Sequence, residues 1–177
     1  MTRFLLIRHG ETAWHLTNAK GATGWGAELA PLTETGIRQI QGITQAVREW
    51  SPEIILSSPT SRTLHTCALL STALGIPFEV AFDLHEWIPD FQFKWKTSDD
   101  ILVSRKEMEQ LGGEWPEGET RCWEPLSQVR QRVSSVLKRY SNRARVAVTC
   151  HEIVISALTG RNIGLAERIE YNTSDET

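Results

Sequence analysis

Hydrophobic residues occur in short runs along the chain, and polar or turn-forming residues close each run. The first run extends from Arg3 to Arg8 and is closely followed by Gly10. Its shortness and the glycine predict a buried β-strand. Runs of the same kind predict further strands at Glu53–Ser57, Phe78–Phe82 and Arg145–Thr149.

Other segments place their hydrophobic residues at the spacing of a helix. Thr33 can cap a helix that continues to about Trp50, with isoleucine and valine side chains along one face. Pro59 can open a second helix, which Gly75 would end. The same spacing predicts helices over about 124–142 and 152–158.

Alternating strands and helices predict an α/β fold, because parallel strands need crossover connections. We expect a three-layer α/β/α sandwich with a mostly parallel central sheet. Residues 15–32 and 83–125 lack a sustained period and are expected to be irregular. A chain of 177 residues has the length of one domain, so we expect a single domain over 1–177.

Composition and charge argue against several classes of protein. Hydrophobic residues make up 40% of the chain, enough for a packed core, and the formal net charge of -3 gives no basic excess for binding nucleic acid. No stretch approaches the roughly 20 apolar residues of a membrane span, and no signal peptide precedes the first strand. The three cysteines lack metal-ligand spacing. We therefore expect a cytoplasmic protein with reduced thiols and neither a membrane nor a nucleic-acid partner.

Reactive side chains follow three of the predicted strands. Arg8 and His9 end the first strand, a serine pair ends the second with Arg62 one turn into the next helix, and His151 ends the last. In an open parallel sheet, ligands bind beyond the carboxyl ends of the strands, where helix N-termini also point. Two histidines and two arginines are thus expected to converge on one crevice.

This set of side chains suits phosphoryl transfer. A guanidinium group can bind two phosphate oxygens at once, and helix N-termini add positive potential. A neutral imidazole can attack phosphorus and form a covalent phosphohistidine. The leaving alkoxide then needs a proton, which a carboxylic acid of raised pKa can supply.

Each residue also has a structural interpretation. A lone histidine after a strand is often a satisfied structural residue, and Arg62 at a helix start is compatible with a surface ion pair. Cys150 beside His151 suggests a thiol nucleophile, but adjacent strand residues point to opposite faces, so both do not easily enter one site. The placement of these residues at three strand ends favours a functional site.

Several motifs occur in an order that resembles the histidine phosphatase superfamily, also called phosphoglycerate-mutase-like. The resemblance runs from Phe4 to about Thr159 and implies that superfamily's α/β/α fold. Its most specific elements are RHGET near the N-terminus, then SSPTSRTLHT, then a late strand ending in histidine. The other matching segments are PLTETG, LHE, GGEWPEGET and VAVTCHE.

The resemblance implies a role for each matching residue. His9 would be the nucleophile, Arg8 and Arg62 would bind the phosphoryl oxygens, and His151 would contact and stabilise the transferring group. Glu86 matches the proton donor. Glu11 is interpreted as supporting the loop. The resemblance implies no metal ion and no organic cofactor.

The sequence departs from the family pattern at two positions near these motifs. His15 stands where the family usually has a phosphate-binding asparagine, so it is a further phosphate-binding candidate. Glu152 replaces the glycine that commonly follows the late histidine. A carboxylate there can cap the helix N-terminus favourably, or it can lie near the phosphate and weaken anion binding.

The composition of the segment after Glu86 helps to distinguish a hydrolase from a mutase. A mutase holds a bisphosphorylated intermediate, which requires further basic residues, but this segment offers only Lys94 and Lys96. Its aromatic residues allow two interpretations. They form a lid that stacks on an apolar or aromatic leaving group, or Phe91, Phe93 and Trp95 form the inward face of an extra strand.

The function predicted is hydrolysis of phosphomonoesters of small metabolites through a phosphohistidine on His9. The enzyme would be a metal-independent, histidine acid phosphatase-like phosphoric monoester hydrolase, with a substrate-covering insert at about 86–120. The alternatives are a phosphoglycerate-type mutase and a catalytically weak phosphate-binding module. The basic residues of the helix predicted over about 124–142 are expected to form its solvated face and not a nucleic-acid surface; they are Arg130, Arg132, Lys138, Arg139 and Arg143. The sequence does not identify the physiological substrate or the oligomeric state.

Overall fold

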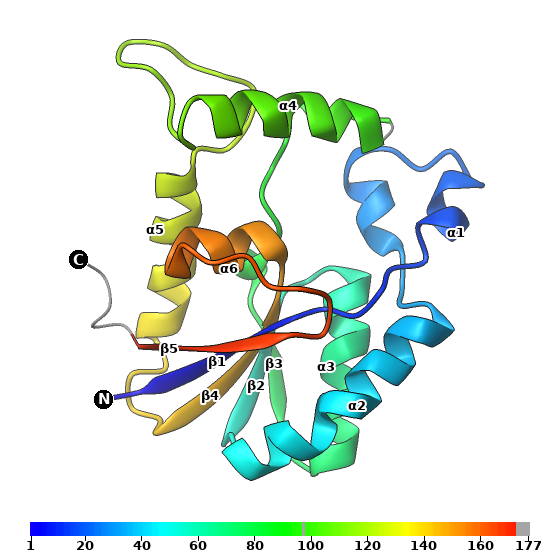
Figure 1. Cartoon of the computed structure of the whole chain (residues 1–177), viewed down its shortest axis with the longest axis vertical. Coiled ribbons are helices and arrows are strands. Elements are labelled where there is room, and N and C mark those ends of the chain that lie inside the picture. Colours follow the sequence, from blue (N-terminus) through cyan, green and yellow to red (C-terminus); the bar gives the residue numbers. More distant parts are fainter. Residues whose placement is uncertain (97, 173–177) are drawn as a thin grey trace.

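A five-stranded sheet with the order β3-β2-β4-β1-β5 forms the centre of the molecule (Figure 1). The computed structural model describes residues 1–96 and 98–172. Neighbouring strands are parallel except for the last, which runs antiparallel to β1. The strands are β1 (Arg3–Arg8), β2 (Ile54–Ser57), β3 (Phe78–Val80), β4 (Arg145–Cys150) and β5 (Arg168–Asn172).

Helices cover both faces of this sheet, which confirms the α/β/α sandwich. Helices α2 (Glu34–Trp50) and α3 (Ser61–Leu74) pack together on one face, and α5 (Leu126–Lys138) and α6 (Glu152–Thr159) pack on the other. Helix α4 (Ser98–Gln110) crosses above α6 in Figure 1. The short helices are α1 (Trp14–Asn18), η1 (Gly24–Leu29) and η2 (Phe82–Leu84). None of the helices within the described ranges is long and apolar enough to cross a membrane.

The period of two along β1 explains why this strand is buried on both sides. Leu5 and Ile7 belong to the hydrophobic core shared with α2 and α3, whereas Phe4 and Leu6 belong to the core under α5 and α6. Phe4, Leu6 and Ile7 are fully buried. The continuous apolar run that predicted the strand is therefore a consequence of two packed faces.

The chain makes a close crossing directly after β1. A Cβ atom on Gly10 would lie 2.6 Å from the carbonyl oxygen of Gly36, and one on Gly36 would lie 2.3 Å from that of Glu11. Both positions therefore require glycine. Thr33 caps α2 by accepting a hydrogen bond from Gly36 N–H, as expected. This crossing fixes the turn that follows His9.

Three expectations for the irregular segments were wrong. Residues 15–32 contain α1 and η1, and residues 83–125 contain α4. The extra strand through Phe91, Phe93 and Trp95 is absent from the described segment 91–96. The Asp90 carboxylate accepts hydrogen bonds from the backbone N–H groups of Gln92 and Lys94, which bends the chain. Phe93 has a φ of 56°, outside the strand region.

Candidate active site

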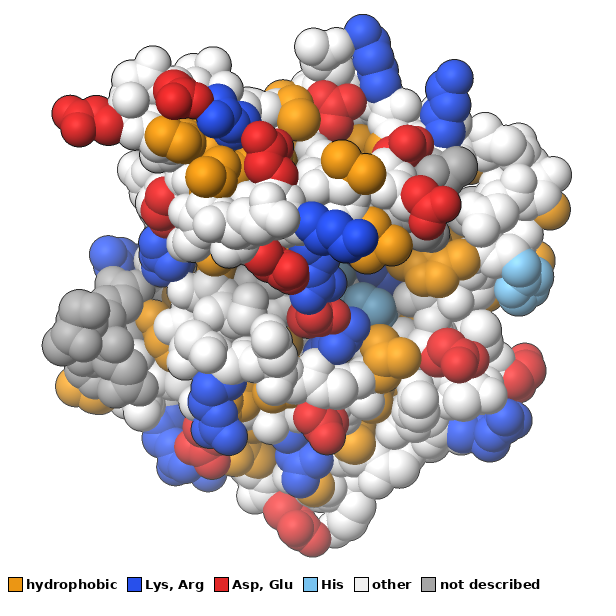
Figure 2. Space-filling model, turned by 45° about the horizontal axis from the view of Figure 1, so that its top comes forward, with side chains coloured by type: hydrophobic (Ala, Val, Ile, Leu, Met, Phe, Trp, Pro, Cys, Tyr) orange, Lys and Arg blue, Asp and Glu red, His pale blue; other side chains and the backbone are white. Residues whose placement is uncertain are grey.

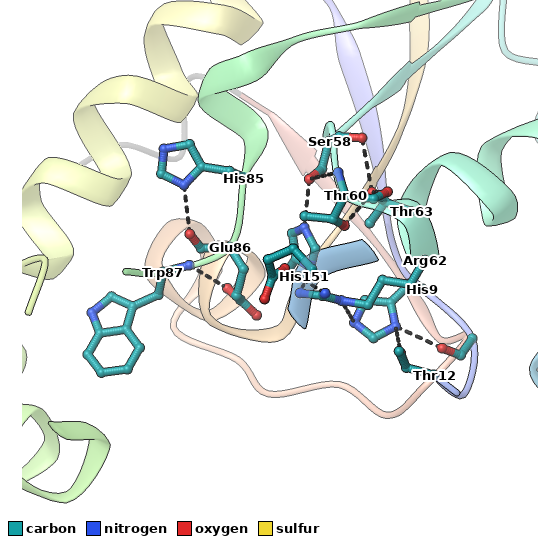
Figure 3. Close-up of polar contacts among 12 residues, drawn as sticks. His9, Thr12, Ser58, Thr60, Arg62, Thr63, His85, Glu86, Trp87 and His151 are labelled. Carbon is teal, nitrogen blue, oxygen red and sulfur yellow. Dashed lines mark hydrogen bonds and ion pairs between the residues drawn. The ribbon is translucent and has the colours of Figure 1, made fainter. Parts of the chain in front are cut away.

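The carboxyl ends of β1, β2 and β4 lie side by side and bring the predicted residues together. Arg62 stands between the two histidines in Figure 3, with Nε donating to His9 Nε2 at 3.2 Å and Nη2 donating to His151 Nδ1 at 3.2 Å. The two imidazole rings are 5.4 Å apart between centroids. Residues that are about fifty and ninety positions apart along the chain thus form one cluster.

The hydrogen bonds of His9 select one tautomer. Its Nδ1 lies 2.8 Å from the carbonyl oxygen of Gly10, which can only accept, so Nδ1 carries the proton. Nε2 therefore keeps its lone pair and accepts from Arg62. Burial, followed by the charges of Arg62 and Arg8, lowers the pKa of His9 to about 3. The imidazole is accordingly neutral at physiological pH.

His151 is the second neutral imidazole of the cluster. Its Nδ1 accepts from the Arg62 guanidinium, which can only donate, so the proton is on Nε2. That N–H lies 2.7 Å from the hydroxyl oxygen of Ser58 at the end of β2. Burial and then the charge of Arg62 lower the pKa of this fully buried ring well below its usual range.

Each of the two arginines also pairs with a carboxylate. Arg62 Nη1 lies 2.6 Å from Glu28, and its guanidinium lies 5.1 Å from the Trp14 ring centroid. Arg8 Nη2 lies 2.5 Å from Glu152. Arg62 is therefore a buried ion-paired residue rather than the surface pair considered above; its side chain is only 3% exposed.

Glu152 bridges the site to α4. Its second carboxylate oxygen lies 2.7 Å from Arg105, so the carboxylate lies between two guanidinium groups. Arg8 also donates from Nη1 to the carbonyl oxygen of Ile163 at 2.7 Å. Glu152 is also the first residue of α6, so its negative charge interacts favourably with the positive end of the helix dipole.

Glu86 follows η2 and its carboxyl turns toward His151 and His9 in Figure 3. One carboxyl oxygen accepts from the backbone N–H of Trp87 at 2.9 Å. Burial raises the pKa of Glu86, whereas the Trp87 N–H and the charge of Arg62 act in the opposite direction. A protonated carboxyl group at this position is therefore favoured relative to a solvated glutamate.

Arg132 of α5 holds the segment that carries Glu86. Its Nη1 donates to the carbonyl oxygens of Asp83 at 2.6 Å and His85 at 2.8 Å. Nε and Nη2 lie 2.7 and 3.0 Å from the two carboxylate oxygens of the buried Glu124. The expectation that Arg132 belongs to a solvated helix face was wrong, because these partners draw the guanidinium inward.

Two other candidate side chains lie apart from the cluster. His15 is exposed on α1 and is not among the residues that line the cavity described below, whereas Trp14 is. Cys150 packs into the hydrophobic core, and burial raises the pKa of its thiol far above the usual range. This is the opposite of what an attacking thiolate needs. The described residues contain no group of three or more His, Cys, Asp or Glu side chains arranged to hold a metal ion.

Sequence reasoning missed three groups that the fold brings to the site. Glu28 lies on η1 and Arg105 on α4, both in segments expected to be irregular. Ser58 belongs to the SSPTSRTLHT segment, but nothing in that segment was a reason to assign it a role. Nothing in the local sequence distinguishes these residues, because their contacts depend on how distant segments pack.

A cavity of about 340 Å³ opens from this cluster. Arg8, His9, Arg62 and Glu86 line it, whereas the fully buried His151 is not among its lining residues. The space-filling view shows a hollow on this face in which basic, acidic and hydrophobic side chains meet (Figure 2). The cavity is large enough for a small phosphorylated metabolite.

Comparison with known families agrees with this geometry. The model of the histidine phosphatase superfamily (branch 1) matches residues 4–172. The chain belongs to this superfamily. The match extends past the end of the motifs quoted above and includes β5.

Curated relatives of this chain include phosphatases and a probable mutase. The adenosylcobalamin/alpha-ribazole phosphatase of Escherichia coli is 27% identical over 92% of this chain and 80% of that protein. The uncharacterized phosphatase PhoE of Bacillus subtilis is 34% identical over 49% of this chain, and the probable phosphoglycerate mutase GpmB of Yersinia pestis is 37% identical over 43%. These two matches span 42% and 34% of the respective relatives.

Solved structures show the same fold. A mycobacterial glucosyl-3-phosphoglycerate phosphatase, described as a complex with VO3, aligns with a TM-score of 0.71 at 19% identity over 96% of this chain and 90% of its own. A putative alpha-ribazole-5'-P phosphatase from Escherichia coli aligns with a TM-score of 0.63 at 25% identity over 93% and 80%. This member of the superfamily therefore has the fold of these two proteins.

Proposed function

We propose that this protein hydrolyses phosphomonoesters of small metabolites through a phosphohistidine on His9. The observation that carries the proposal is the neutral His9 imidazole, whose unprotonated Nε2 points at the guanidinium that also contacts His151. A buried, uncharged imidazole beside fixed positive charge is a suitable nucleophile for an anionic phosphoryl group.

Arg62 and Arg8 are the proposed phosphate ligands. When phosphate enters, the N–H groups of Arg62 would move from the imidazoles to the phosphoryl oxygens and free Nε2 for attack. His151 would help hold the transferring group, and the N-termini of α3 and α6 would add positive potential. The buried position of Arg62 supports this role, since its charge is little screened by water.

Glu86 is the proposed proton donor. Its raised pKa and its position on the cavity wall suit a carboxylic acid that protonates the leaving oxygen. After the ester oxygen leaves, the same carboxylate would take a proton from the water that attacks the phosphohistidine. The residues around 86–120 would act as the substrate cover, since Trp87, Trp95 and Arg105 line the cavity.

The mutase alternative is less well supported by the cavity. Each arginine that lines it already pairs with a carboxylate, through Glu28 or Glu152. Lys94 and Lys96, the basic residues considered for a second phosphate, line a separate hollow. A bisphosphorylated intermediate would thus bring a second dianion next to acidic side chains.

Turnover of 4-nitrophenyl phosphate tests the proposal. We expect hydrolysis that survives a metal chelator, is inhibited competitively by vanadate, and is lost in His9→Ala. His65→Ala is the matched control, because His65 lies on α3 and does not line the cavity. No turnover between pH 5 and 8 across a panel of phosphoesters would favour the binding-module alternative. Phosphate transfer between positions of phosphoglycerate would favour the mutase.

The described cysteines support the expected compartment. Cys67, Cys122 and Cys150 are all free, which is common in reducing compartments such as the cytoplasm. Fractionation of cells that express the native gene would test this placement directly.

A further inference from the structure

We infer that the leaving-group side of the cavity selects phosphomonoesters of uncharged, flat aromatic alcohols. The inference rests on the proposed phosphatase activity and names the substrate class for that same site. Beyond the phosphate clamp, the cavity is lined by four tryptophans together with aliphatic side chains; the tryptophans are Trp14, Trp25, Trp87 and Trp95.

Trp87 places one aromatic wall beside the proposed acid. Its backbone N–H binds the Glu86 carboxyl, so the two side chains leave adjacent backbone positions. Its indole N–H donates to the carbonyl oxygen of Glu124 at 2.6 Å, which fixes the ring. The leaving oxygen must meet Glu86, and Trp87 lines the same cavity.

Trp25 and Trp95 form a second aromatic wall, and other aromatic rings pack against it. The Trp25 ring packs against Phe93 and edge-on against His85, with centroids 5.4 and 5.6 Å apart. Gly24 makes this packing close, since a Cβ there would lie 2.3 Å from the carbonyl oxygen of Phe93. A wall whose rings are already ordered loses little entropy when it stacks on a ligand.

The charges around these walls disfavour a second anionic group on the substrate. Arg8 and Arg105 share Glu152, and Arg62 pairs with Glu28. When phosphate engages Arg8 and Arg62, the two carboxylates stay in the lining. No lysine is among the residues that line this cavity in the described part of the chain. A carboxylate or second phosphate on the leaving group would therefore meet negative charge rather than a free cation.

Matched alkyl phosphates test ring preference without a change in leaving-group chemistry. Benzyl, cyclohexylmethyl and ethyl phosphate all release alcohols of similar acidity. We expect kcat/KM for benzyl phosphate to exceed that for ethyl phosphate about tenfold or more, and to exceed that for the non-aromatic ring a few-fold. Trp25→Leu should lower the benzyl-to-ethyl ratio about fivefold. Trp50→Leu, a tryptophan outside the cavity, should leave the ratio unchanged.

A charged analogue tests the acidic rim. Benzyl phosphate with a carboxylate in the para position should react at least tenfold more slowly than benzyl phosphate. Glu152→Gln should narrow that gap, because it removes one carboxylate and releases Arg8 and Arg105. Equal rates for the neutral and carboxylated esters would overturn the charge part of the inference.

The inference and the proposed function fail in different ways. Hydrolysis of benzyl and ethyl phosphate at equal efficiency would overturn the aromatic pocket and leave the phosphatase standing. If no ester is hydrolysed, the proposed phosphatase activity is refuted, and the preference for aromatic groups is then tested by ligand binding. Benzylphosphonate, which has no ester bond, should then bind at least tenfold more tightly than methylphosphonate and lose this advantage in Trp25→Leu. Equal binding of the two phosphonates would overturn the inference on its own.

Discussion

Arg62 Nε donates a hydrogen bond to His9 Nε2 across 3.2 Å, so the buried guanidinium of the site touches the nitrogen of the His9 ring that carries no proton. The contact lowers the basicity of His9 and positions the lone pair. It also means that an anion must displace this hydrogen bond before the imidazole can attack. Binding and activation of the nucleophile are thus coupled through a single guanidinium.

Replacement of Arg62 by lysine should abolish this coupling while keeping the charge. An ammonium group cannot reach His9, His151 and Glu28 together, because it lacks the planar fork. We expect kcat/KM for 4-nitrophenyl phosphate to fall about 10²- to 10³-fold in Arg62→Lys. Arg38→Lys on the exposed side of α2 is the control and should behave like the wild type. A tenfold or smaller loss in Arg62→Lys would show that charge alone is sufficient.

Glu86→Gln should have an effect that depends on the leaving group. We expect kcat/KM for benzyl phosphate to fall about 10²- to 10⁴-fold and that for 4-nitrophenyl phosphate far less, since nitrophenolate leaves without a proton. Because burial raises the Glu86 pKa, wild-type activity toward benzyl phosphate should decline as pH rises through that pKa and the acid is lost. Equal losses with both esters would remove Glu86 from the proton-donor role.

Arg132 should act on catalysis by positioning Glu86. Arg132→Lys would release the carbonyls of the 83–86 segment and leave Glu124 buried with a poorer partner. We expect about 3 kcal/mol lower free energy of unfolding, and a ratio of benzyl to nitrophenyl phosphate activity about tenfold lower. Arg130→Lys, whose exposed pair with Glu114 is worth about 0.5 kcal/mol or less, is the matched control. A destabilised Arg132→Lys with an unchanged activity ratio would reduce Arg132 to a structural residue.

The low pKa of His9 should make stability depend on pH. The folded state resists protonation down to about pH 3, whereas the unfolded imidazole protonates near its ordinary value of 6.5. Between these values the unfolded state binds more protons, so stability must fall as pH decreases. For His9 alone, we expect about 1–2 kcal/mol less stability at pH 5 than at pH 7.

Denaturant unfolding of wild type and His9→Asn at the two pH values measures this contribution. The variant should lose less stability on acidification by about that amount, and His65→Asn should not. Saturating phosphate should reduce the wild-type loss, because a bound anion favours the protonated ring. An identical pH dependence in wild type and His9→Asn would contradict the low pKa.

The site histidines and arginines could be predicted from the sequence because the prediction did not require the order of the strands in the sheet. Arg8, His9 and His151 each sit at the end of an apolar run, and parallel strands bring such ends to one edge. The close crossing at Gly10 was likewise consistent with the glycine after the first strand. Local pattern and tertiary placement agree at these positions.

Elements with little burial could not be predicted in the same way. In β5, Tyr171 is buried, whereas Arg168 and Glu170 are exposed, so the segment has no apolar run. Helix α4 buries Met108 but exposes Leu102 and Val103, which obscures its period. Such segments take their structure from tertiary contacts rather than from their own hydrophobic pattern.

Long-range polar pairs were also beyond sequence reasoning. Glu28 lies 34 residues before Arg62, and Arg105 lies 47 residues before Glu152. No spacing rule links such positions. Arg132 shows the same limit, since the basic residues of its helix were expected to form a solvated face, whereas its actual partners lie on other segments.

Direct trapping of the phosphorylated enzyme tests the central claim that His9 is the nucleophile. A rapid alkaline quench during turnover of 2,4-dinitrophenyl phosphate, followed by peptide mass spectrometry, would locate the phosphate, because this leaving group favours accumulation of the intermediate. We predict a phosphate on His9 that is stable in base, labile in acid and absent from His9→Ala. A burst of dinitrophenol with no phosphate on His9, or with an acid-stable phosphate on another residue, would contradict the account.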